Sequence, residues 1–275
     1  MITASVVLYK TPLEEVDTVI KSFAPCSERK LFLLDNSPEY NEAFDQIREL
    51  PDVEFIFSGE NLGYGRANNK GIEKALAAGS DYHIVMNPDL KFEPDIINRL
   101  AEFADADPDI IYIMPKVVDE AGEVQHLCKL LPTPADLIFR RFFPDRGIFR
   151  KNNEKYVLAS SGYDRIMDPP CLSGCFMFMR AKTLREGGLR FDERFFMYCE
   201  DFDLIRRLHR VGKTLYYPEV TVIHKQSRAS YFDREMLRAH IVSACRYFNK
   251  YGWFIDRERR EMNRKILREL DACHE

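Results

Sequence analysis

Acidic residues gather at two places in this chain, about 110 positions apart. The first is the turn Asn87-Pro88-Asp89, which follows the apolar run 82–86. The second is the stretch 187–203, where five carboxylates lie among aromatic residues: Asp192, Glu193, Glu200, Asp201 and Asp203. Carboxylate oxygens bind divalent cations, and a carboxylate can take a proton from a hydroxyl group. Two such clusters are what a protein needs to hold a metal–diphosphate and to deprotonate a hydroxyl beside it.

Each cluster also has an ordinary structural explanation. Acidic residues in the first turn of a helix are stabilised by its dipole and free amides, so Glu200 and Asp201 could simply begin a helix. Asn-Pro-Asp is a common turn sequence. A site is therefore indicated only if other motifs accompany the two clusters.

A glycine- and asparagine-rich segment, 61–71, lies between them. Glycines let the backbone approach a ligand, and the free amides at a helix start can bind phosphate. The segment is neither a G-x-G-x-x-G motif nor a Walker A loop, which disfavours a dinucleotide-binding enzyme. Its asparagines could instead cap the helix.

Two further candidates follow apolar runs. Asp35 and Asn36 could hydrogen-bond a nucleobase or ribose, although a turn is the ordinary explanation of Asp-Asn-Ser. His224 stands 23 residues beyond Asp201. A lone histidine at a strand end is usually structural, but imidazole is also a common metal ligand.

The overall composition is that of a globular protein of 275 residues, 45% hydrophobic and 31% charged. A net charge of −4 argues against a nucleic-acid partner. The seven cysteines are scattered, and Cys171 and Cys175 have no second pair at zinc-ligand spacing. The amino-terminal run lacks the features of a signal peptide, and no apolar run approaches the roughly 18–20 residues that span a bilayer. We expect reduced thiols in a cytoplasmic protein that meets a membrane only from the side.

Short apolar runs alternate with helical patterns through the first half. The expected strands are 4–9, 30–35, 53–57, 82–86 and 110–113, and the expected helices are 13–23, 44–50, 71–78 and one that begins at Pro94. Such alternation predicts a mostly parallel sheet flanked by helices, with ligands at the carboxyl ends of the strands. That geometry places Tyr9, Asp35, Asn36 and the Asn87–Asp89 turn on one rim.

The second half has a different pattern. Residues 125–165 show weak periodicity and predict a long excursion, followed by strands 175–180 and 214–224 with the helix 201–211 between them. From Ser227 the chain is expected to be helical as far as Tyr251, with a highly charged tail from Asp256. We therefore expect a main domain over 1–225 and a helical carboxyl-terminal extension over 226–275.

Together these motifs resemble the inverting glycosyltransferases of family 2, which have the GT-A fold, and among them the bacterial rhamnosyltransferases that build surface polysaccharide. The resemblance covers about residues 1–250. The family's N-x-G-x-x-x-A-x-N-x-G segment is matched by Asn61, Gly63, Ala67, Asn69 and Gly71. It implies an α/β, Rossmann-like GT-A fold with a nucleotide-binding half, 1–115, and an acceptor-binding and catalytic half, 116–225.

The resemblance also implies a role for each candidate residue. Asp201 would be the general base, beside Glu200. Asn87-Pro88-Asp89 occupies the family's D-x-D position with Asn in place of the first Asp, so Asp89 would be the main ligand of Mg²⁺ or Mn²⁺, helped by His224. The implied donor-binding residues are Tyr9, Asp35, Asn36, Asn61, Gly63, Gly65, Arg66, Asn69, Asn87, Ser173 and Gly174.

Residues 138–151 hold four phenylalanines and five basic residues against one Asp. This composition is typical of a segment at a membrane interface, and equally of a core-packed excursion with solvated basic side chains. Family members use lipid-linked acceptors at the inner membrane face. The resemblance therefore implies transfer of a sugar, most simply L-rhamnose from dTDP-L-rhamnose, to a saccharide or lipid-linked acceptor, with peripheral membrane contact through 138–151.

Two alternatives remain open. A sugar-phosphate nucleotidyltransferase would need a glycine-rich basic loop after the first strand, whereas residues 10–15 are Lys-Thr-Pro-Leu-Glu-Glu. A non-catalytic nucleotide-sugar-binding protein is favoured by Asn87 and disfavoured by the presence of Asp89 and Asp201.

Overall fold

The structure, a computed structural model, describes residues 1–137, 147–225 and 234–272. Among these residues the strands form one eight-stranded sheet in the order β3-β2-β1-β4-β7-β6-β8-β5. The strands are β1 (Ile2–Leu8), β2 (Arg29–Asp35), β3 (Val53–Phe57), β4 (Tyr82–Met86), β5 (Leu90–Lys91), β6 (Ile110–Val118), β7 (Phe176–Arg180) and β8 (Lys213–His224). All seven runs expected to be strands are strands, and the α/β fold class is confirmed.

The sheet is mixed. Strands β1 to β4 are parallel, as their alternation with helices predicts, and β6 is parallel to β8. Strand β7 runs antiparallel to both β4 and β6, and β5 antiparallel to β8. The long excursion returns the chain to the carboxyl end of β4, where Met86 pairs with Phe176, so β7 must run back along its neighbour.

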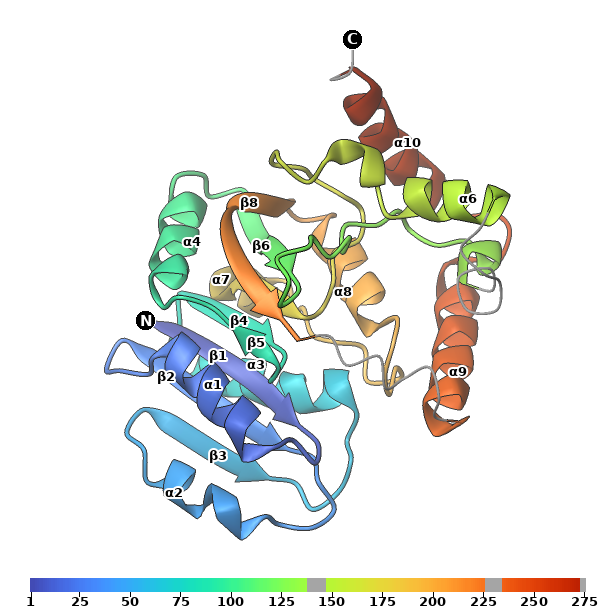
Figure 1. The fold of residues 1–275 in the computed structure, drawn as a ribbon. Helices are drawn as coiled ribbons and strands as arrows, with labels where there is room; N and C mark the ends of the chain where they lie inside the picture. Colours follow the sequence, from blue (N-terminus) through green and yellow to red (C-terminus); the bar gives the residue numbers. More distant parts are fainter. Residues whose placement is uncertain (138–146, 226–233, 273–275) are drawn as a thin grey trace.

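Helices cover both faces of the sheet (Figure 1). They are α1 (Leu13–Phe23), α2 (Asp45–Arg48), α3 (Tyr64–Ala77), α4 (Asp95–Asp105), α6 (Ile148–Tyr156), α7 (Ala181–Glu186), α8 (Glu200–Leu208), α9 (Arg234–Tyr251) and α10 (Arg257–Ala272). Two short 3-10 helices, Glu42–Phe44 and Ala159–Ser161, accompany them. No helix in these described ranges is long and apolar enough to cross a membrane.

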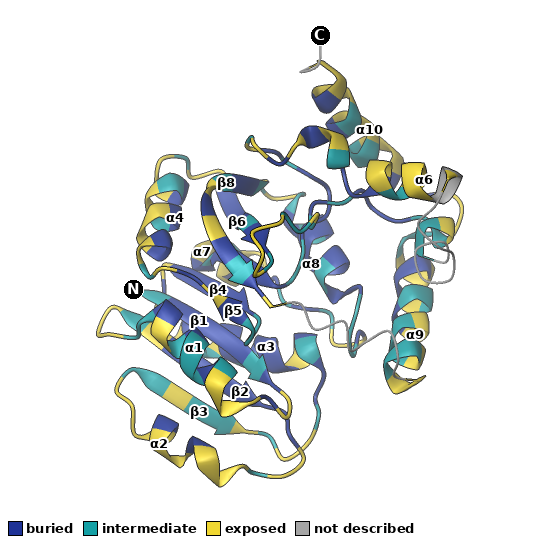
Figure 2. Ribbon diagram, in the orientation of Figure 1, coloured by how far each residue is buried: buried dark blue, intermediate teal, exposed yellow. Residues whose placement is uncertain are grey.

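Alternate side chains of the strands feed two hydrophobic cores. On β4, Ile84 and Met86 pack with α1 and α4, whereas Val85 packs on the opposite face with α3, α7 and α8. This is the two-residue period of a strand that is buried on both sides. The central strands of the sheet are therefore buried on both faces (Figure 2).

Helix α3 begins seven residues before the expected start, at Tyr64 rather than Gly71. Gly71 lies inside the helix, which packs so closely on β1 that a Cβ at this position would come within 2.4 Å of the Ser5 Cβ. The glycine therefore serves close packing of helix on strand and does not mark a helix boundary.

The charged segment after Asp256 is also helical. Ile266 and Leu270 of α10 are buried in the same core as α8, and Tyr247 and Phe248 of α9 pack beside Phe202. Most of its charged side chains are exposed, whereas the apolar face of α10 is buried (Figure 2).

Candidate active site

A cavity of about 550 Å³ lies at the carboxyl edge of the sheet. Ligands of open α/β sheets bind at this edge. Eleven of the predicted site residues line the cavity: Tyr9, Asn36, Asn61, Gly63, Asn87, Asp89, Ser173, Gly174, Glu200, Asp201 and His224. Residues from the ends of β1, β2, β4 and β8 thus meet the start of α8 around one space.

Four predicted donor-binding residues do not line it. Asn69 donates to the Phe191 carbonyl (3.0 Å) and to Glu193 Oε1 (3.1 Å), and accepts from the Phe191 amide (2.9 Å). A Cβ at Gly65 would approach the Phe191 Cβ to 2.9 Å. Arg66 is exposed, 3.7 Å from Glu193. These three residues fasten α3 to the acidic loop 187–199.

The fourth, Asp35, is fully buried just beneath the cavity. Its Oδ1 accepts from the Ser37 amide (3.0 Å), but its Oδ2 has no hydrogen-bond partner among the described residues. The neighbouring Asn36 donates to the Gly63 carbonyl (3.2 Å), and its Oδ1 is likewise unpartnered within that part of the chain. Buried polar atoms are nearly always hydrogen-bonded in folded proteins. We therefore expect a bound ligand to donate hydrogen bonds to these two oxygens, Asp35 Oδ2 and Asn36 Oδ1.

Asp89 and His224 are brought together by the pairing of β5 with β8. Leu90 pairs with His224, and the Lys225 amide donates to the Asp89 carbonyl (3.0 Å). His224 Nε2 then lies 3.2 Å from Asp89 Oδ1 and 3.3 Å from Asn87 Nδ2. The two residues predicted as metal ligands therefore lie side by side in the wall of the cavity.

Gln125 holds the imidazole of His224 in place. Its Oε1 lies 2.9 Å from His224 Nδ1, and its Nε2 donates to the His224 carbonyl (2.8 Å). A hydrogen bond at Nδ1 favours the tautomer whose Nε2 lone pair is free for a ligand. Gln125 comes from the long excursion, where local sequence gave no sign of it.

This donor set fits a divalent cation that is shared with a ligand. One carboxylate oxygen and one imidazole nitrogen point toward the same open space. No three His, Cys, Asp or Glu side chains in the described ranges form a complete metal cage. A cation here would therefore need oxygen ligands from a diphosphate or from water.

Glu200 and Asp201 begin α8 side by side, Glu200 buried and Asp201 half-buried. Burial, and then the neighbouring Asp201, raise the pKa of Glu200 well above its usual value. Burial also raises the pKa of Asp201, but Lys129 and the backbone amides of Phe202 and Gly174 oppose that shift. Because two adjacent carboxylates at a buried site cannot both ionise readily, Glu200 holds a proton more readily than Asp201 does.

The backbone ahead of this pair is strained. Tyr198 and Cys199 have φ angles of 70° and 64°, in the left-handed region that side chains other than glycine rarely adopt. Strain of this kind persists only where the surroundings enforce it, and it occurs often at functional sites. Here it turns the chain so that the carboxylates of α8 face the cavity.

Two glycines allow three loops to converge. Gly63 has φ of 80°, and a Cβ there would lie 2.2 Å from the Phe196 carbonyl oxygen. The next residue, Tyr64, donates its amide to that carbonyl (2.9 Å) and its hydroxyl to the Gly174 carbonyl (2.7 Å). A Cβ at Gly174 would touch the Asp201 Cβ at 3.4 Å.

Tyr64 and Lys129 line the cavity although the sequence did not single them out. Tyr64 stands at a helix start inside the 61–71 segment, a signal that was available but assigned to Gly71. Lys129 is placed by backbone pairing with Cys171, its amide donating to the Cys171 carbonyl (2.8 Å). Such a contact between distant segments leaves no mark in local sequence.

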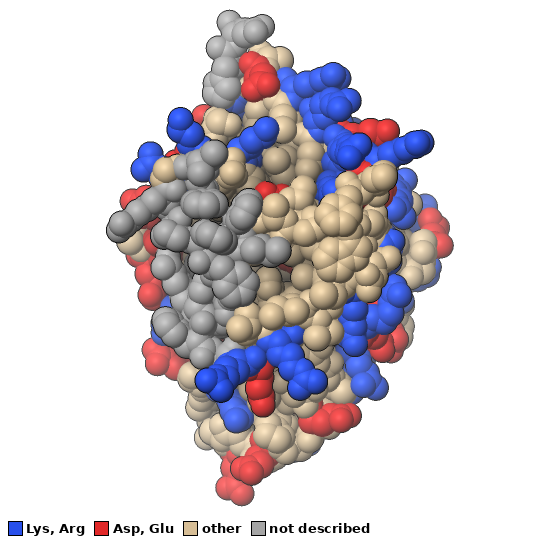
Figure 3. Space-filling view, turned by 90° about the vertical axis from the view of Figure 1, so that its right-hand side faces the viewer, with Lys and Arg blue, Asp and Glu red and all other residues tan. Residues whose placement is uncertain are grey.

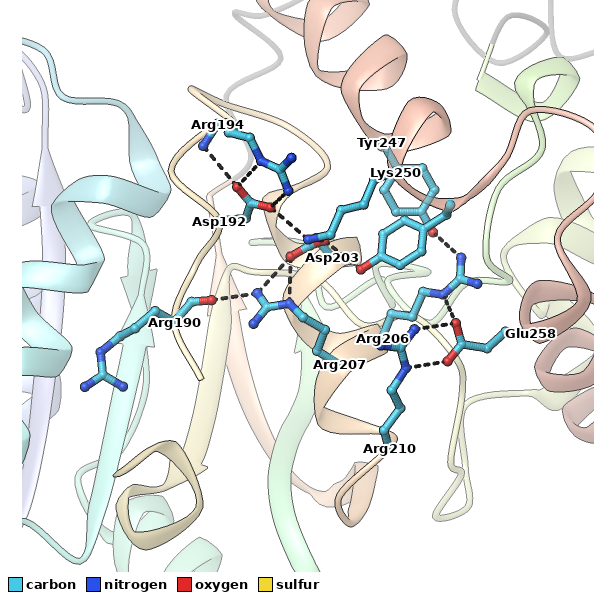
Figure 4. Close-up of polar contacts among 11 residues, drawn as sticks. Arg190, Asp192, Arg194, Asp203, Arg206, Arg207, Arg210, Tyr247, Lys250 and Glu258 are labelled. Carbon is cyan, nitrogen blue, oxygen red and sulfur yellow. Dashed lines mark hydrogen bonds and ion pairs between the residues drawn. The ribbon is translucent and has the colours of Figure 1, made fainter. Parts of the chain in front are cut away.

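Helix α8 is anchored by charged side chains of the carboxyl-terminal helices (Figure 4). Asp203, fully buried, accepts from Arg207 (2.9 Å), from the Tyr251 hydroxyl (2.7 Å) and from Lys250. Lys250 also reaches Asp192 (2.8 Å) in the acidic loop. Asp192 thus ties the acidic loop to α9.

Arg206 forms the second anchor. It is only 1% exposed and binds both carboxylate oxygens of Asp256 at 2.7 and 2.6 Å. It also contacts Glu258 (2.6 Å) and the Tyr247 hydroxyl (3.3 Å). The helix that carries Glu200 and Asp201 is therefore held in place by α9 and α10.

A larger hollow of about 800 Å³ lies at the opposite, amino edge of the sheet. Its cations already have partners: Arg29 binds Asn98 (2.7 Å), and Arg180 binds the carbonyls of Ala104 (2.6 Å) and Ile110 (3.0 Å). Of the two cavities, the smaller one, at the carboxyl edge of the sheet, holds the side chains that could bind a ligand and act on it. Residues 138–146 of the predicted membrane segment lie outside the described residues.

Comparisons with known proteins identify the family of this chain. The family model described as glycosyl transferase family 2 matches residues 27–162. An N-acetylglucosaminyl-diphospho-decaprenol L-rhamnosyltransferase of Mycobacterium tuberculosis is 29% identical over 261 residues, 89% of this chain and 83% of that protein. Rhamnosyltransferase WbbL of Escherichia coli is 30% identical over 199 residues, 69% of this chain and 71% of that protein.

Solved structures share the fold at low sequence identity. TarS 1–349 of S. aureus in complex with UDP has a TM-score of 0.58 and 14% identity, over 97% of this chain and 70% of that one. GalNAc-T7 with UDP, GalNAc and Mn²⁺ has a TM-score of 0.58 and 15% identity, over 82% of this chain but 44% of that one. At this identity they support the fold alone, which is the predicted GT-A fold.

Proposed function

Because this chain belongs to the family 2 glycosyltransferases, we propose that it transfers L-rhamnose from dTDP-L-rhamnose to a lipid-linked saccharide, with inversion at the anomeric carbon. The rhamnosyltransferase relatives support the donor, and the N-acetylglucosaminyl-diphospho-decaprenol named for one of them supports the acceptor class. We place the enzyme in the cytoplasm, at the inner face of the membrane, in surface polysaccharide synthesis. The observation that carries the proposal is that Asp201 and the Asp89–His224 pair line one cavity.

The nucleotide would lie over the carboxyl ends of β1 and β2, within the proposed nucleotide-binding half, 1–115. Asp35 Oδ2 and Asn36 Oδ1, buried and unpartnered in the described part of the chain, supply acceptors for the N–H group of a pyrimidine base. Asn36 lines the cavity and would make this contact first, whereas Asp35, fully buried behind it, would be reached only where the wall opens on binding.

The diphosphate would lie near Asp89 and His224. A divalent cation held by these two residues would offset the negative charge that develops on the departing nucleoside diphosphate. Gln125 keeps His224 Nε2 turned toward that position. Asn87 cannot add a second negative charge, so the cation would bind well only together with the nucleotide.

Asp201 would act as the general base on the acceptor side, in the proposed catalytic half, 116–225. It takes the proton of the acceptor hydroxyl as that oxygen bonds to the anomeric carbon, while the bond from carbon to diphosphate oxygen breaks. Glu200 keeps its proton, so the pair carries a single negative charge, and Lys129 stabilises it.

Nucleotide preference is the direct test of the donor. We expect dTDP with Mn²⁺ or Mg²⁺ to raise the melting temperature more than UDP or GDP, and EDTA to remove most of the gain. Incubation with dTDP-L-rhamnose and an N-acetylglucosaminyl-diphospho-lipid should then give a product heavier by one deoxyhexose. A larger shift with UDP or GDP would overturn the donor. Nucleotide binding without transfer to any acceptor would favour the non-catalytic alternative.

A further inference from the structure

Exposed apolar side chains are concentrated at one edge of the molecule. Of the eleven large hydrophobic residues that are exposed in the described ranges, five lie on α9 or in the turn that follows it: Ile241 48%, Val242 38%, Trp253 38%, Phe254 81% and Ile255 74%. We call these five residues the apolar edge. Figure 3 looks onto this side of the molecule and shows an uncharged area bordered by Lys and Arg.

Packing and hydrogen bonds hold the residues of the apolar edge near the end of α9 in place. Helix α9 buries Ser243, Tyr247 and Phe248 against the core, whereas Ile241 and Val242, near its middle, are exposed. The Trp253 ring packs on Phe248, with centroids 5.3 Å apart, and its Nε1 donates to Asn249 Oδ1 (2.8 Å).

The turn itself is fixed by Gly252. Its φ is 104°, a Cβ there would lie 2.4 Å from the Ile255 carbonyl oxygen, and its amide donates to the Phe248 carbonyl (2.7 Å). Phe254 and Ile255 are therefore held outward, the two most exposed large apolar side chains in the described part of the chain.

A basic strip follows directly. Arg257, Arg260, Arg264 and Arg268 are exposed, and their spacing puts them on one face of α10. None of the four forms an ion pair with another described residue, and the acidic residues on the same face are Glu261 and Asp271. This positive strip stands out in a chain whose net charge is −4.

We propose that the apolar edge and the α10 arginines together dock the protein on an anionic lipid surface. Aromatic and aliphatic side chains at a protruding turn, next to a row of arginines, match the apolar and charged layers of a bilayer interface. A second copy of this chain fits less well. A two-fold contact would bring the two arginine strips together, and five side chains fall short of the roughly 800 Å² per partner that a stable interface buries.

The same helix leads to the cavity. The ring of His240 on α9 contacts that of Tyr198 (5.1 Å), and the Ser243 hydroxyl donates to the Met197 carbonyl (2.8 Å). Met197 and Tyr198 line the cavity on the acceptor side. Docking through α9 would therefore bring the bilayer next to the side of the cavity where the acceptor enters. The role of docking in delivering the acceptor rests on the proposed function, whereas binding of the protein to lipid does not.

Trp253 is the single tryptophan of the chain and reports on the docking without a label. With phosphatidylglycerol vesicles we expect its emission to shift to the blue and to be quenched by brominated acyl chains. Phosphatidylcholine vesicles should give a much smaller change, and high salt should reduce the effect. Phe254→Ser with Ile255→Ser should weaken vesicle binding at least about ten-fold, and Arg260→Gln with Arg264→Gln by a similar factor.

Matched controls are available elsewhere on the surface. Leu50 and Phe57 are each 40% exposed, beside and on β3 at the far edge of the sheet (Figure 1), so Leu50→Ser with Phe57→Ser removes apolar surface away from α9 and α10. This variant should bind vesicles like the native protein. Equal weakening in the control, or no change of Trp253 emission with any vesicle, would overturn the proposal. So would a blue shift that follows protein concentration without lipid, because a second copy would then cover the edge.

Transfer assays separate this proposal from the enzymatic one. With an acceptor embedded in vesicles, the Phe254 and Ile255 changes should lower the rate, while a short-chain, water-soluble acceptor should be used at the native rate. Equal rates with both acceptors would refute docking as the route to the acceptor. If no acceptor is used by any variant, the proposed function fails, and the vesicle result still decides whether this surface binds lipid.

Discussion

At the scale of single residues, the environment of Asp201 separates it from the other acidic residues of its loop. It lines the cavity, is half-buried, and has Lys129 and backbone amides to stabilise its charge. Asp201→Asn keeps the size of the side chain but removes the base. We expect turnover to fall by roughly 10²–10⁴-fold, with little change in the affinity for dTDP measured by calorimetry.

The matched control for this change is Glu193→Gln. It removes a carboxylate of the same loop that is mostly exposed, and should leave turnover within a few-fold of native. Near-native turnover of the Asp201 variant would remove this residue from the mechanism.

Glu200 predicts a pH-dependent stability. Its pKa is raised in the folded protein, mainly by burial, so below about pH 4.5 it is protonated in both the folded and the unfolded chain. Above that pH only the unfolded chain readily loses the proton, and the folded state loses stability as the pH rises toward the raised pKa. Glu200→Gln should therefore raise the melting temperature at pH 8 and change it little at pH 4. An equal shift at both pH values would show that Glu200 is not kept protonated by the fold.

Asp89 and His224 make a graded prediction about metal dependence. Asp89→Ala should abolish the gain in dTDP affinity that Mn²⁺ provides, because it removes the charged ligand of the proposed pair. His224→Ala should weaken that gain less, and Gln125→Ala less again, since Gln125 acts by orienting the imidazole. Titration calorimetry with and without EDTA measures all three, and native affinity that EDTA leaves unchanged would exclude the metal role of both residues.

At the scale of elements, the strands were predictable because their apolar runs are local. The turns at Asn87-Pro88-Asp89 and at Glu200-Asp201 were predictable for the same reason, since each adjoins a regular element. The places of Lys129 and Gln125 in the site were not predictable. Lys129 is positioned by Cys171 and Gln125 by His224, and both partners lie far along the chain. Gly71 was assigned to a helix start although close packing on Ser5 explains it.

The joint between β3 and α3 offers an element-scale test through a pair of matched glycines. Gly63 and Gly122 have nearly equal φ angles of 80° and 85°, but a Cβ would meet the Phe196 backbone only at Gly63 and finds open space at Gly122. Gly122→Ala should cost only the roughly 1–2 kcal/mol of a left-handed backbone. Gly63→Ala should cost more, because its ψ of 172° belongs to a region that only glycine adopts readily and because the new Cβ would displace the 187–199 loop, which should also weaken dTDP binding. Equal losses of stability, with dTDP affinity unchanged, would mean that the contact with Phe196 does not shape the site.

At the scale of the whole molecule, the question is whether residues 226–275 are an extension or part of the main domain. Removing 257–275 would take Ile266 and Leu270 out of the core and Glu258 away from Arg206. Arg206 is 1% exposed, and a buried charge that loses a partner destabilises by about 3–5 kcal/mol. We therefore expect the truncated protein to melt far below the native protein or to aggregate, and Arg206→Met, which strands Asp256 instead, to lose stability by a similar amount. As a control, Arg268→Gln alters an exposed charge of α10 and should leave the melting temperature unchanged. A truncated protein that melts like the native one and still binds dTDP would show that α10 is an appendage, and that α8 is held in place without it.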